Sequence, residues 1–561
     1  MLVEKLENYL KKLAKDYLGK EHTQIRHHIR VFVPSDLNLG DFSTNILFLF
    51  SKILKKSPYD IFNALKSKIE KLPYIEKLEI GNGYLNIFVS KKILFENFKT
   101  ILLKNSKFLE NNLGRRQKLI IEYVSANPTG PLHLGNARGA VIGDILAKLF
   151  KLSNFKVTKE YYVNDRGRQI EILVDSILYH LGQGEYNEEF YQGDYIKELA
   201  EIVKNNLKTF DRKEIKKIAL RYILDKLIKK PLQKFGTQFD NFYFETGLYK
   251  KGLDKKILKI LERKKLLEHR EGAIWLLLTK LGEPKDEVLI KKDGEPSYFF
   301  SDILYNYEKF FIRKYKYSII LVSSDHQDHA RRLLKTFTEV FSIKENRFKI
   351  LIYQMVHITK GEELLRMSKR KGIYITLDEL IELLGINPIR FYFSKYALEN
   401  TVELDIDLAL KESEENPIWY ALYTYARFNS ILKKARSKEF KIPSKKVIKN
   451  NLTKAYRYIL GREGYIQILR KVQQLQTISY DAIKNIRPNL LSQYLIEICK
   501  ELNAFYEKEK ILEGDYQDIK LKLIFVIYII KVLDLIFYLL SLKPVKELYN
   551  LNRKSTNQIT Q

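Results

Sequence analysis

Cysteine is almost absent from this sequence, which has one, Cys499, among its 561 residues. A single cysteine cannot form an internal disulfide, and without a cysteine cluster the sequence gives no ground for a zinc site. Cys499 lies in the apolar run LIEICK, where we expect a small buried residue rather than a nucleophile. Such cysteine usage is typical of a reducing compartment, so we expect a cytoplasmic protein.

Long apolar runs are also scarce. The one membrane-like stretch, residues 523–542, is interrupted by Lys531 and Asp534, and a charge at the bilayer centre costs about 3 kcal/mol. These charges stand at i and i+3 and can pair on one helix face, so we expect a buried helix of an all-α domain and no membrane partner. Residues 1–18 carry charge throughout, which predicts an amphipathic helix instead of a signal peptide.

Acidic residues are few beside basic ones: 68 Asp and Glu against 98 Lys and Arg give a net charge of +30. Such an excess indicates a polyanionic partner, with nucleic acid first among the candidates. The alternative, that a compositional bias toward lysine has enriched ordinary solvated helix faces, stays open. The length predicts about three or four domains.

The rest of the chain is organised around residues 118–150, KLIIEYVSANPTGPLHLGNARGAVIGDILAKLF. A β-branched run, a polar loop with two prolines and an apolar-periodic segment predict a strand, a loop and a helix. We expect Pro131 in the first helical turn. Gly130, Gly135 and Gly139 would keep Cβ atoms away from a ligand over the helix start.

The predicted start of this helix suits a phosphate group, because exposed N–H groups and the positive end of the helix dipole meet there. His133 and Asn136, at i and i+3, would face the same phosphate chain. A second candidate is the basic loop RMSKRKG, residues 366–372, where Lys369 suits a pyrophosphate whose charge grows as it leaves. An ordinary basic surface turn is the open alternative for this loop.

The order of elements predicts an α/β fold with a split Rossmann-like parallel sheet. We expect a small N-terminal α/β domain over 1–112, the Rossmann-like domain over 113–414 with a helical insertion at about 183–285, and an all-α domain over 415–561. Aromatic residues interleave with basic ones in the last domain, and suit either RNA bases or the bundle core. They include Tyr420, Tyr423, Tyr425, Phe505 and Tyr506.

Several strings together resemble one family. SANPTGPLHLGN resembles the first ATP-binding motif of class I aminoacyl-tRNA synthetases, and RMSKR resembles their second. With YVNDRGRQI, DGEPSYFFSDI and DIDLALKESEENPIWYALYTYAR, in this order, the chain resembles arginyl-tRNA synthetases from end to end. LGDFSTNILFLFSKIL resembles part of the family's N-terminal tRNA-contacting domain, and the helical end its anticodon-binding domain.

The resemblance implies that ATP, carried with Mg²⁺, and L-arginine form arginyl-adenylate with loss of pyrophosphate. Arginine would then pass to the 3′-terminal ribose of tRNA(Arg). No zinc is expected, and the chain is expected to be a monomer. Such transfers depend mainly on positioning and electrostatic stabilisation.

Carried over residue by residue, the resemblance implies that His133, Asn136 and Lys369 are catalytic. The implied ATP contacts are Pro128, Thr129, Gly130, His133, Gly135, Asn136, Met367, Ser368, Lys369 and Arg370. Two positions depart from the usual class pattern: Asn136 stands in place of a second histidine, and Arg366 in place of a first lysine. Both substitutes can still hydrogen-bond phosphate.

An arginine pocket needs fixed carboxylates and carbonyl-type acceptors, because a guanidinium carries five donors and no acceptor. The resemblance implies Glu122 and Asn127 near the amino and carboxylate ends of the substrate. Tyr298, Asp302 and His326 would line the guanidinium side and the neighbouring wall. Asp302 would pair with the guanidinium; its alternative role is an N-cap of the helix that follows.

Competing functions remain. The histidines in DHQDH, residues 325–329, lack the HExxH spacing of a zinc site. Another class I synthetase or a small nucleotidyltransferase would share the phosphate motifs, but not the string around 298–302 together with the long basic helical end. A non-catalytic tRNA-binding paralogue should have lost His133 or Lys369, and this sequence keeps both.

Overall fold

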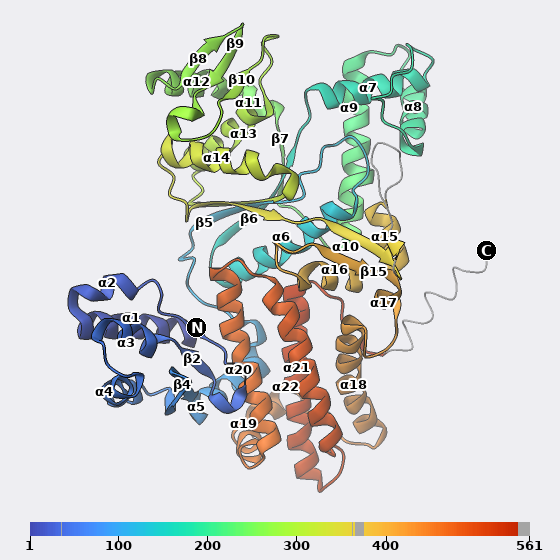
Figure 1. Ribbon diagram of the computed structural model, residues 1–561. Coiled ribbons are helices and arrows are strands. Elements are labelled where there is room, and N and C mark those ends of the chain that lie inside the picture. Colours follow the sequence, from blue (N-terminus) through green and yellow to red (C-terminus); the bar gives the residue numbers. More distant parts are fainter. Residues whose placement is uncertain (35, 362, 365–374, 548–561) are drawn as a thin grey trace. The chain divides into compact units, whose positions relative to one another are not determined.

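The computed structural model describes residues 1–34, 36–361, 363–364 and 375–547 (Figure 1). The chain forms two compact units. One is Leu113–Leu410, and the other joins Met1–Asn112 to Lys411–Gln561.

A five-stranded parallel sheet, ordered β12-β11-β5-β6-β7, is the centre of the unit Leu113–Leu410. Its strands are β5 Lys118–Glu122, β6 Lys156–Val163, β7 Asn241–Phe244, β11 Tyr317–Ser323 and β12 Phe348–Tyr353. The predicted split parallel sheet is confirmed. The chain passes from β5 to β6 and β7 on one side and returns to β11 and β12 on the other. Open α/β sheets bind ligands beyond the carboxyl ends of their strands, at such a reversal of strand order.

Helix α6 (Leu134–Leu152) follows β5 but begins later than predicted. His133 is its N-cap, so Pro131 lies ahead of the helix, and its predicted place in the first turn is wrong. The physical reason is that His133 and Asn136 cap the helix between them. If Pro131 had been the first helical residue, the N-cap would have been Gly130, which has no side chain to accept a hydrogen bond.

Two glycines of α6 serve helix packing. A Cβ on Gly143 would lie 2.3 Å from the ring of Tyr123, and a Cβ on Gly139 would lie 3.0 Å from the hydroxyl of Tyr353. Gly139 therefore lets a side chain of the sheet approach α6 closely.

A buried ion pair fixes α6 to α16 (Ile386–Lys395). Arg390 Nη2 donates to Asp144 Oδ2 at 2.8 Å, and the two side chains are 0% and 5% exposed. Thr237 and Tyr123 also donate to Asp144, at 2.6 and 2.9 Å. The carboxylate is thus fully hydrogen-bonded, as a buried charge requires.

The segment predicted as a helical insertion, about 183–285, is not helical throughout. It contains β7, an edge strand of the parallel sheet, and part of a three-stranded antiparallel sheet. The run NFYF of β7 is too short for periodicity to distinguish a strand from a buried helical segment. The helices before β7 are α7 Arg168–His180, α8 Asp194–Asn206, α9 Arg212–Tyr222, the π-helix η4 Ile223–Lys229 and α10 Lys230–Phe235.

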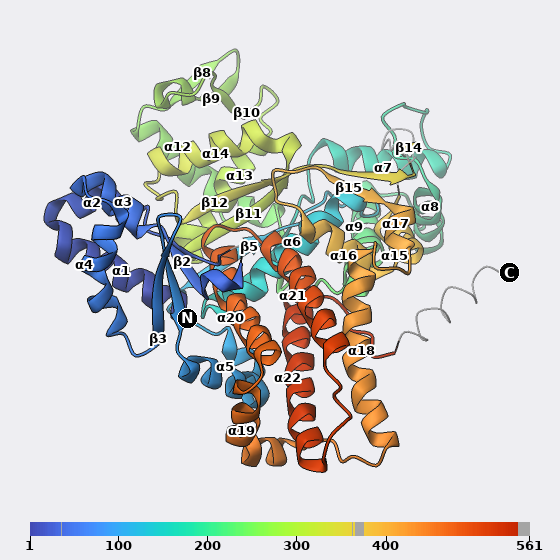
Figure 2. The ribbon, with the colours of Figure 1, turned by 60° about the horizontal axis from the view of Figure 1, so that its bottom comes forward.

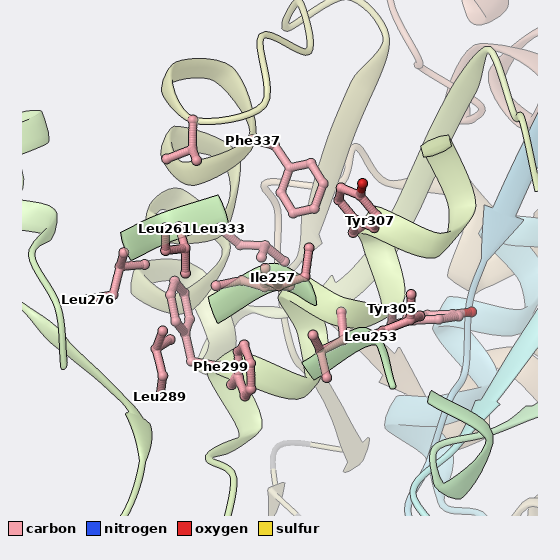
Figure 3. Close-up of a cluster of buried hydrophobic side chains, with 14 of the residues drawn as sticks. Leu253, Ile257, Leu261, Leu276, Leu289, Phe299, Tyr305, Tyr307, Leu333 and Phe337 are labelled. Carbon is pink, nitrogen blue, oxygen red and sulfur yellow. The ribbon is translucent and has the colours of Figure 1, made fainter. Parts of the chain in front are cut away.

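After β7 the chain builds a small subdomain over the same sheet. Its elements are α11 Thr246–Lys250, α12 Leu253–Arg263, β8 Leu267–Arg270, β9 Ala273–Leu276, β10 Glu287–Ile290, α13 Tyr298–Tyr307, the π-helix η6 Glu308–Ile312 and α14 Gln327–Glu339. Figure 3 shows how side chains from α12, α13 and α14 interdigitate; Ile257, Phe299 and Phe337 are each at most 3% exposed. This core holds α13, which carries two of the predicted substrate residues.

The remaining elements of this unit come after β12 in the chain. They are β13 Val356–Lys360, β14 Glu363–Leu364, α15 Leu377–Leu384, α16, β15 Val402–Asp405 and α17 Ile406–Leu410. β13 pairs with β15 in parallel and with β14 in antiparallel.

The N-terminal part of the other unit is an antiparallel sheet, ordered β1-β2-β4-β3, with helices. Its main elements are α1 Leu2–Leu18, α2 His22–Ile25, β1 Val31–Phe32, β2 Phe42–Thr44, α3 Ile46–Leu54, α4 Pro58–Glu70, β3 Ile75–Gly81, β4 Tyr84–Val89 and α5 Lys91–Lys104. Strands β3 and β4 form a hairpin across Asn82 and Gly83, which have φ of 49° and 78°, as a tight hairpin turn requires.

Up to residue 547, where the described part of the chain ends, the C-terminal part consists of five long helices: α18 Pro417–Ser437, α19 Lys445–Leu460, α20 Glu463–Lys484, α21 Asn489–Lys508 and α22 Tyr516–Leu540. Helices α20, α21 and α22 run side by side in both views (Figures 1 and 2). Within the described residues α22 alone is long and apolar enough to cross a membrane, and 78% of its most apolar window is buried in the protein. Asp534 accepts a hydrogen bond from the Tyr425 hydroxyl on α18 at 2.7 Å, so the helix packs as part of the bundle core.

The helical bundle contains Cys499 and the aromatic residues predicted to suit either RNA or the core. Cys499 is fully buried, and burial raises the pKa of its thiol to about 12, as expected of an unreactive core residue. Among the aromatic candidates, Tyr425 and Phe505 are 2% and 5% exposed and belong to the core. Tyr423 instead stacks on Trp419, with ring centroids 5.0 Å apart, and lies beside the Arg427 guanidinium.

Candidate active site

The loop that follows β5 leaves the strand with strained backbone. Val124 and Ser125, neither of them glycine, have φ of 69° and 38°. Hydrogen bonds hold this conformation: the Ser125 hydroxyl accepts from the N–H of Tyr162 at 3.1 Å, and the Tyr161 hydroxyl donates to the Ala126 carbonyl at 2.7 Å. Such strain costs about 1–3 kcal/mol per residue and is characteristic of functional sites.

His133 and Asn136 hold the start of α6 by reciprocal hydrogen bonds. The N–H of Gly135 donates to His133 Nδ1 at 3.1 Å, and the N–H of His133 donates to Asn136 Oδ1 at 3.1 Å. Because Nδ1 accepts, a neutral His133 ring carries its proton on Nε2 and can donate from there. The amide nitrogen of Asn136 is likewise a donor. Both side chains therefore cap the helix, and each also carries a hydrogen-bond donor.

The loop residues before His133 are covered by the helical segment 168–206. The Tyr195 hydroxyl of α8 donates to the Thr129 carbonyl at 2.8 Å, and a Cβ on Gly130 would lie 3.0 Å from that hydroxyl. Asn127 donates from Nδ2 to Gln169 on α7 at 2.6 Å. Pro128 is buried. The predicted ATP loop is thus fixed by α7 and α8, a contact that the sequence did not indicate.

Asp302 lies in the second turn of α13 and is paired with His329. The two side chains, 31% and 29% exposed, approach to 2.5 Å between Asp302 Oδ2 and His329 Nε2. Ser297 is the N-cap of α13, so the alternative that Asp302 caps this helix is wrong. His326 is exposed on the short helix before α14, and His329 is the histidine that contacts Asp302.

Tyr298 opens α13 and is 51% exposed. Burial and the charge of Glu245 raise the pKa of the Tyr298 hydroxyl, while a hydrogen bond from Asn164 opposes the rise. Asn164 belongs to the polar turn after β6, so this turn and α13 meet at the carboxyl edge of the sheet.

Glu245 is a carboxylate that the sequence interpretation missed. It follows β7 directly, is 3% exposed, and accepts a hydrogen bond from the Ser301 hydroxyl at 2.9 Å. Burial raises its pKa; hydrogen bonds from Ser301 and Tyr162 oppose the rise, and the nearby Asp302 adds to it. Recognising NFYF as a strand would have placed Glu245 at the binding edge of the sheet.

Glu122, at the end of β5, is buried against a lysine. Lys309 Nζ donates to Glu122 Oε2 at 2.5 Å, and the lysine side chain is 0% exposed. Burial raises the pKa of Glu122, and the charge of Lys309 opposes this rise. Lys309 is on the π-helix η6, and the sequence did not single it out.

Together, the described site residues form two groups at the carboxyl edge of the sheet. One is the loop and capped helix start at Asn127–Asn136, and the other is the acidic cluster around Asp302 and Glu245. Four predicted ATP contacts, Met367, Ser368, Lys369 and Arg370, lie outside the described residues, as does Arg366.

Comparisons with known proteins agree with this arrangement. Residues 97–385 match the family model described as tRNA synthetases class I (R), catalytic domain. Residues 2–89 match the arginyl tRNA synthetase N terminal domain, and residues 421–548 match the DALR anticodon binding domain.

Among curated relatives, the arginine–tRNA ligase of Acetivibrio thermocellus is 34% identical over 84% of this chain and 86% of its own length. That of Thermotoga maritima is 30% identical over 91% and 94%. The solved arginyl-tRNA synthetase of Thermus thermophilus shares the fold, with a TM-score of 0.74, 20% identity, and coverage of 98% of this chain and 100% of that one.

A split parallel sheet whose central strand leads into a histidine-capped helix, in a chain that matches the class I catalytic domain over these residues, defines a class I aminoacyl-tRNA synthetase. Its partners are accordingly ATP, an amino acid and tRNA. From the identity shared with curated relatives along most of its length, the chain belongs to the arginyl-tRNA synthetase family.

Proposed function

We propose that the protein activates L-arginine with ATP and transfers it to the 3′-terminal ribose of tRNA(Arg). A carboxylate oxygen of arginine attacks the α-phosphorus, and the bond to the β-phosphate breaks to release pyrophosphate. A ribose hydroxyl then attacks the acyl carbon and AMP leaves. The observation that carries arginine as the substrate is the pair of carboxylates, Asp302 and Glu245, beside Tyr298 at the binding edge.

Each of the predicted substrate and ATP residues has a role that suits its chemistry. Asp302 accepts from the guanidinium, and Tyr298 and His326 border that end of the substrate. Asn127 and Glu122 serve the amino and carboxylate end. His133 and Asn136 donate to the phosphates of ATP, where negative charge develops.

The remaining ATP contacts rest on the sequence motifs. Pro128, Thr129, Gly130 and Gly135 shape the backbone around the nucleotide. Lys369, with Met367, Ser368 and Arg370, holds the departing pyrophosphate. Magnesium enters with ATP as part of that substrate.

The other two regions would serve the tRNA. We assign tRNA contacts to residues 1–112 and anticodon binding to residues 415–561, and their matches to the N terminal and DALR anticodon binding families support this. We further propose that the protein is a monomer and that it acts in the cytoplasm.

The direct test is to charge total tRNA with each of the twenty labelled amino acids in turn, with ATP and magnesium present. We expect attachment of arginine alone. Attachment of another amino acid would support the same type of reaction but refute the assignment of an arginine pocket. Binding of tRNA without any attachment would favour a non-catalytic paralogue.

The contact between His329 and Asp302 predicts that arginine binding weakens as the pH falls. Burial lowers the pKa of His329, but the hydrogen bond and charge of Asp302 outweigh burial, so the pKa is raised above its ordinary value of about 6.5. Arg332 and Glu287 also face this ring, and their charges act in opposite directions. Below the raised pKa the His329 imidazolium is paired with the Asp302 carboxylate. The guanidinium of the substrate must then compete with it for that carboxylate.

The expected result is a KM for arginine that falls as the pH rises through the His329 pKa, from about 6.5 upward. The ion pair itself stabilises the fold most below that ordinary value and is lost above the raised one. His329→Gln should flatten the profile of KM against pH. An unchanged profile in this variant would assign the pH dependence to another group.

A further inference from the structure

The polar turn that directly follows β6 has no role in the chemistry proposed above, yet it contacts both helices beside the acidic cluster. Asn164 forms a hydrogen bond with the Tyr298 hydroxyl at the start of α13. Asp165 accepts hydrogen bonds from α11, and the Arg166 guanidinium lies over the Tyr249 ring of α11, 4.1 Å from its centroid. The turn therefore sets the positions of groups that line the proposed arginine pocket.

Asp165 binds Thr246 with both carboxylate oxygens. Its Oδ1 accepts from the N–H of Thr246 at 3.0 Å, and its Oδ2 accepts from the Thr246 hydroxyl at 2.7 Å. Thr246 is the first residue of α11, and the first N–H groups of a helix have no acceptor within that helix. Asp165 is only 7% exposed, so little water reaches this carboxylate. An aspartate from another element thus caps α11.

The residue before Thr246 is Glu245, whose side chain is engaged elsewhere. Glu245 has helical backbone angles, φ −58° and ψ −39°, and within the described residues its side chain makes no cap hydrogen bond to α11. It accepts instead from the Ser301 hydroxyl of α13 at 2.9 Å. The Glu245 N–H donates to the Val163 carbonyl, at the end of β6, at 3.0 Å. The two peptide N–H groups that flank the Glu245 Cα are therefore held by β6 and by the turn after it.

The far end of α11 is joined to the same cluster. The Tyr249 hydroxyl and the Ser301 hydroxyl are 2.7 Å apart and hydrogen-bonded, and Ser301 passes the chain of hydrogen bonds on to Glu245. Arg166, which lies over the Tyr249 ring, also pairs with Glu295 at 2.7 Å. A shift of α11 would therefore move Glu245 relative to α13.

Recognition of a guanidinium depends on the relative position of the two carboxylates. Glu245 precedes α11 and Asp302 lies in α13, close enough that the charge of Asp302 raises the pKa of Glu245. Carboxylates bind a guanidinium through hydrogen bonds of fixed geometry. A displacement of about 1 Å can cost about 10²-fold in rate. The contact that anchors α11 to the sheet therefore affects how well the pocket fits its substrate.

We propose that Asp165 is a positioning residue for arginine: by capping α11 it fixes the Glu245 carboxylate where, together with Asp302, it matches a guanidinium. This proposal rests on the proposed function, because it takes arginine as the amino-acid substrate. In it Asp165 does not touch the substrate. It acts through Thr246 on the neighbouring Glu245, so its removal should weaken the use of arginine and leave the use of ATP almost unchanged.

The first test compares Asp165→Ala with Asp286→Ala, which removes the same kind of contact. Asp286 accepts from the N–H and the hydroxyl of Thr279 at 3.0 and 2.8 Å, and its side chain is 8% exposed. It also pairs with Arg270 at 3.0 Å, so D286A should lower the urea midpoint of unfolding at least as much as D165A. We expect D165A to raise the KM for arginine by about 10–100-fold and to change the KM for ATP by less than about twofold, while D286A leaves both within about twofold.

Two variants of Thr246 test the same contact even if D165A fails to fold. Thr246→Val removes the hydroxyl and keeps the N–H and the shape of the side chain, whereas Thr246→Ser keeps both donors. We expect T246V to raise the KM for arginine by about 3–10-fold and T246S to behave as the wild type. Equal KM values for arginine in these two variants would overturn the proposal.

Combining D165A with Glu245→Gln shows whether Asp165 acts through Glu245. If it does, D165A should change the KM for arginine by less than about threefold in the E245Q background, because the carboxylate that it positions is already absent. Effects that multiply would mean that Asp165 acts independently of Glu245 and would overturn the proposal. An equal rise in the KM for arginine and for ATP in D165A, or a rise of the same size in D286A, would also overturn it.

Charging of tRNA with arginine by the wild type is measured first, because it separates the two proposals. A wild type that does not charge arginine would refute the proposed function and, with it, the role of Asp165. A wild type that charges arginine, beside a D165A variant with an unchanged KM, would leave the proposed function standing and overturn the role of Asp165 alone.

Discussion

Replacing Asp302 with asparagine should raise the KM for arginine by about two to three orders of magnitude. The change keeps the shape of the side chain but removes its charge, so a guanidinium would meet an amide in a partly desolvated pocket. Removing one partner of such a partly buried charge pair costs about 3–4 kcal/mol, which is about 10²–10³-fold in affinity. The measurement is steady-state charging of tRNA with arginine varied at saturating ATP.

The matched control for this change is Asp328→Asn. Asp328 stands next to His329 in the first turn of α14, but its side chain is 80% exposed and its partner is Arg331, at 3.7 Å. We expect its KM for arginine to stay within about twofold of wild type, as for surface substitutions. An unchanged KM in the Asp302 variant would remove Asp302 from the pocket and leave Glu245 as the carboxylate that could pair with the substrate.

Residues whose role depends on local pattern could be found from the sequence. His133 and Asn136 follow a β-branched strand at the spacing of a helix start, and the structure places both at the N-terminus of α6. Their reciprocal cap was not foreseen, because the two prolines of the loop suggested an earlier start. In this case the hydrogen bonds of two polar side chains set the first residue of the helix.

Residues whose role depends on a partner far along the chain could not be found in this way. Glu245 faces Ser301 and Asp302, which lie more than fifty positions later in the chain. It follows a four-residue edge strand that is too short to be recognised from the sequence pattern. Lys309 reaches Glu122 from a π-helix, whose extra residue per turn rotates side chains away from the face that a regular helical pattern predicts. Periodicity carries no information on either contact.

Replacing Lys309 is expected to have the second large effect, a loss of stability. In Lys309→Met, Glu122 is left as a buried carboxylate without its cation, and we expect the free energy of unfolding to fall by about 3–5 kcal/mol. Urea unfolding followed by circular dichroism measures this change. A loss below about 1 kcal/mol would mean that water or another donor replaces the lysine.

The double variant Lys309→Met/Glu122→Gln separates the fold from the chemistry. Removing both charges eliminates the unpaired carboxylate, so most of the stability should return, as it does when buried ion pairs are replaced whole. If Glu122 serves only to hold the end of β5 against η6, the double variant should also recover the wild-type KM for arginine. We expect the KM to remain raised by at least tenfold, because the proposed function assigns the Glu122 carboxylate to the amino end of the substrate; full recovery would make Lys309 and Glu122 a structural pair beneath the site.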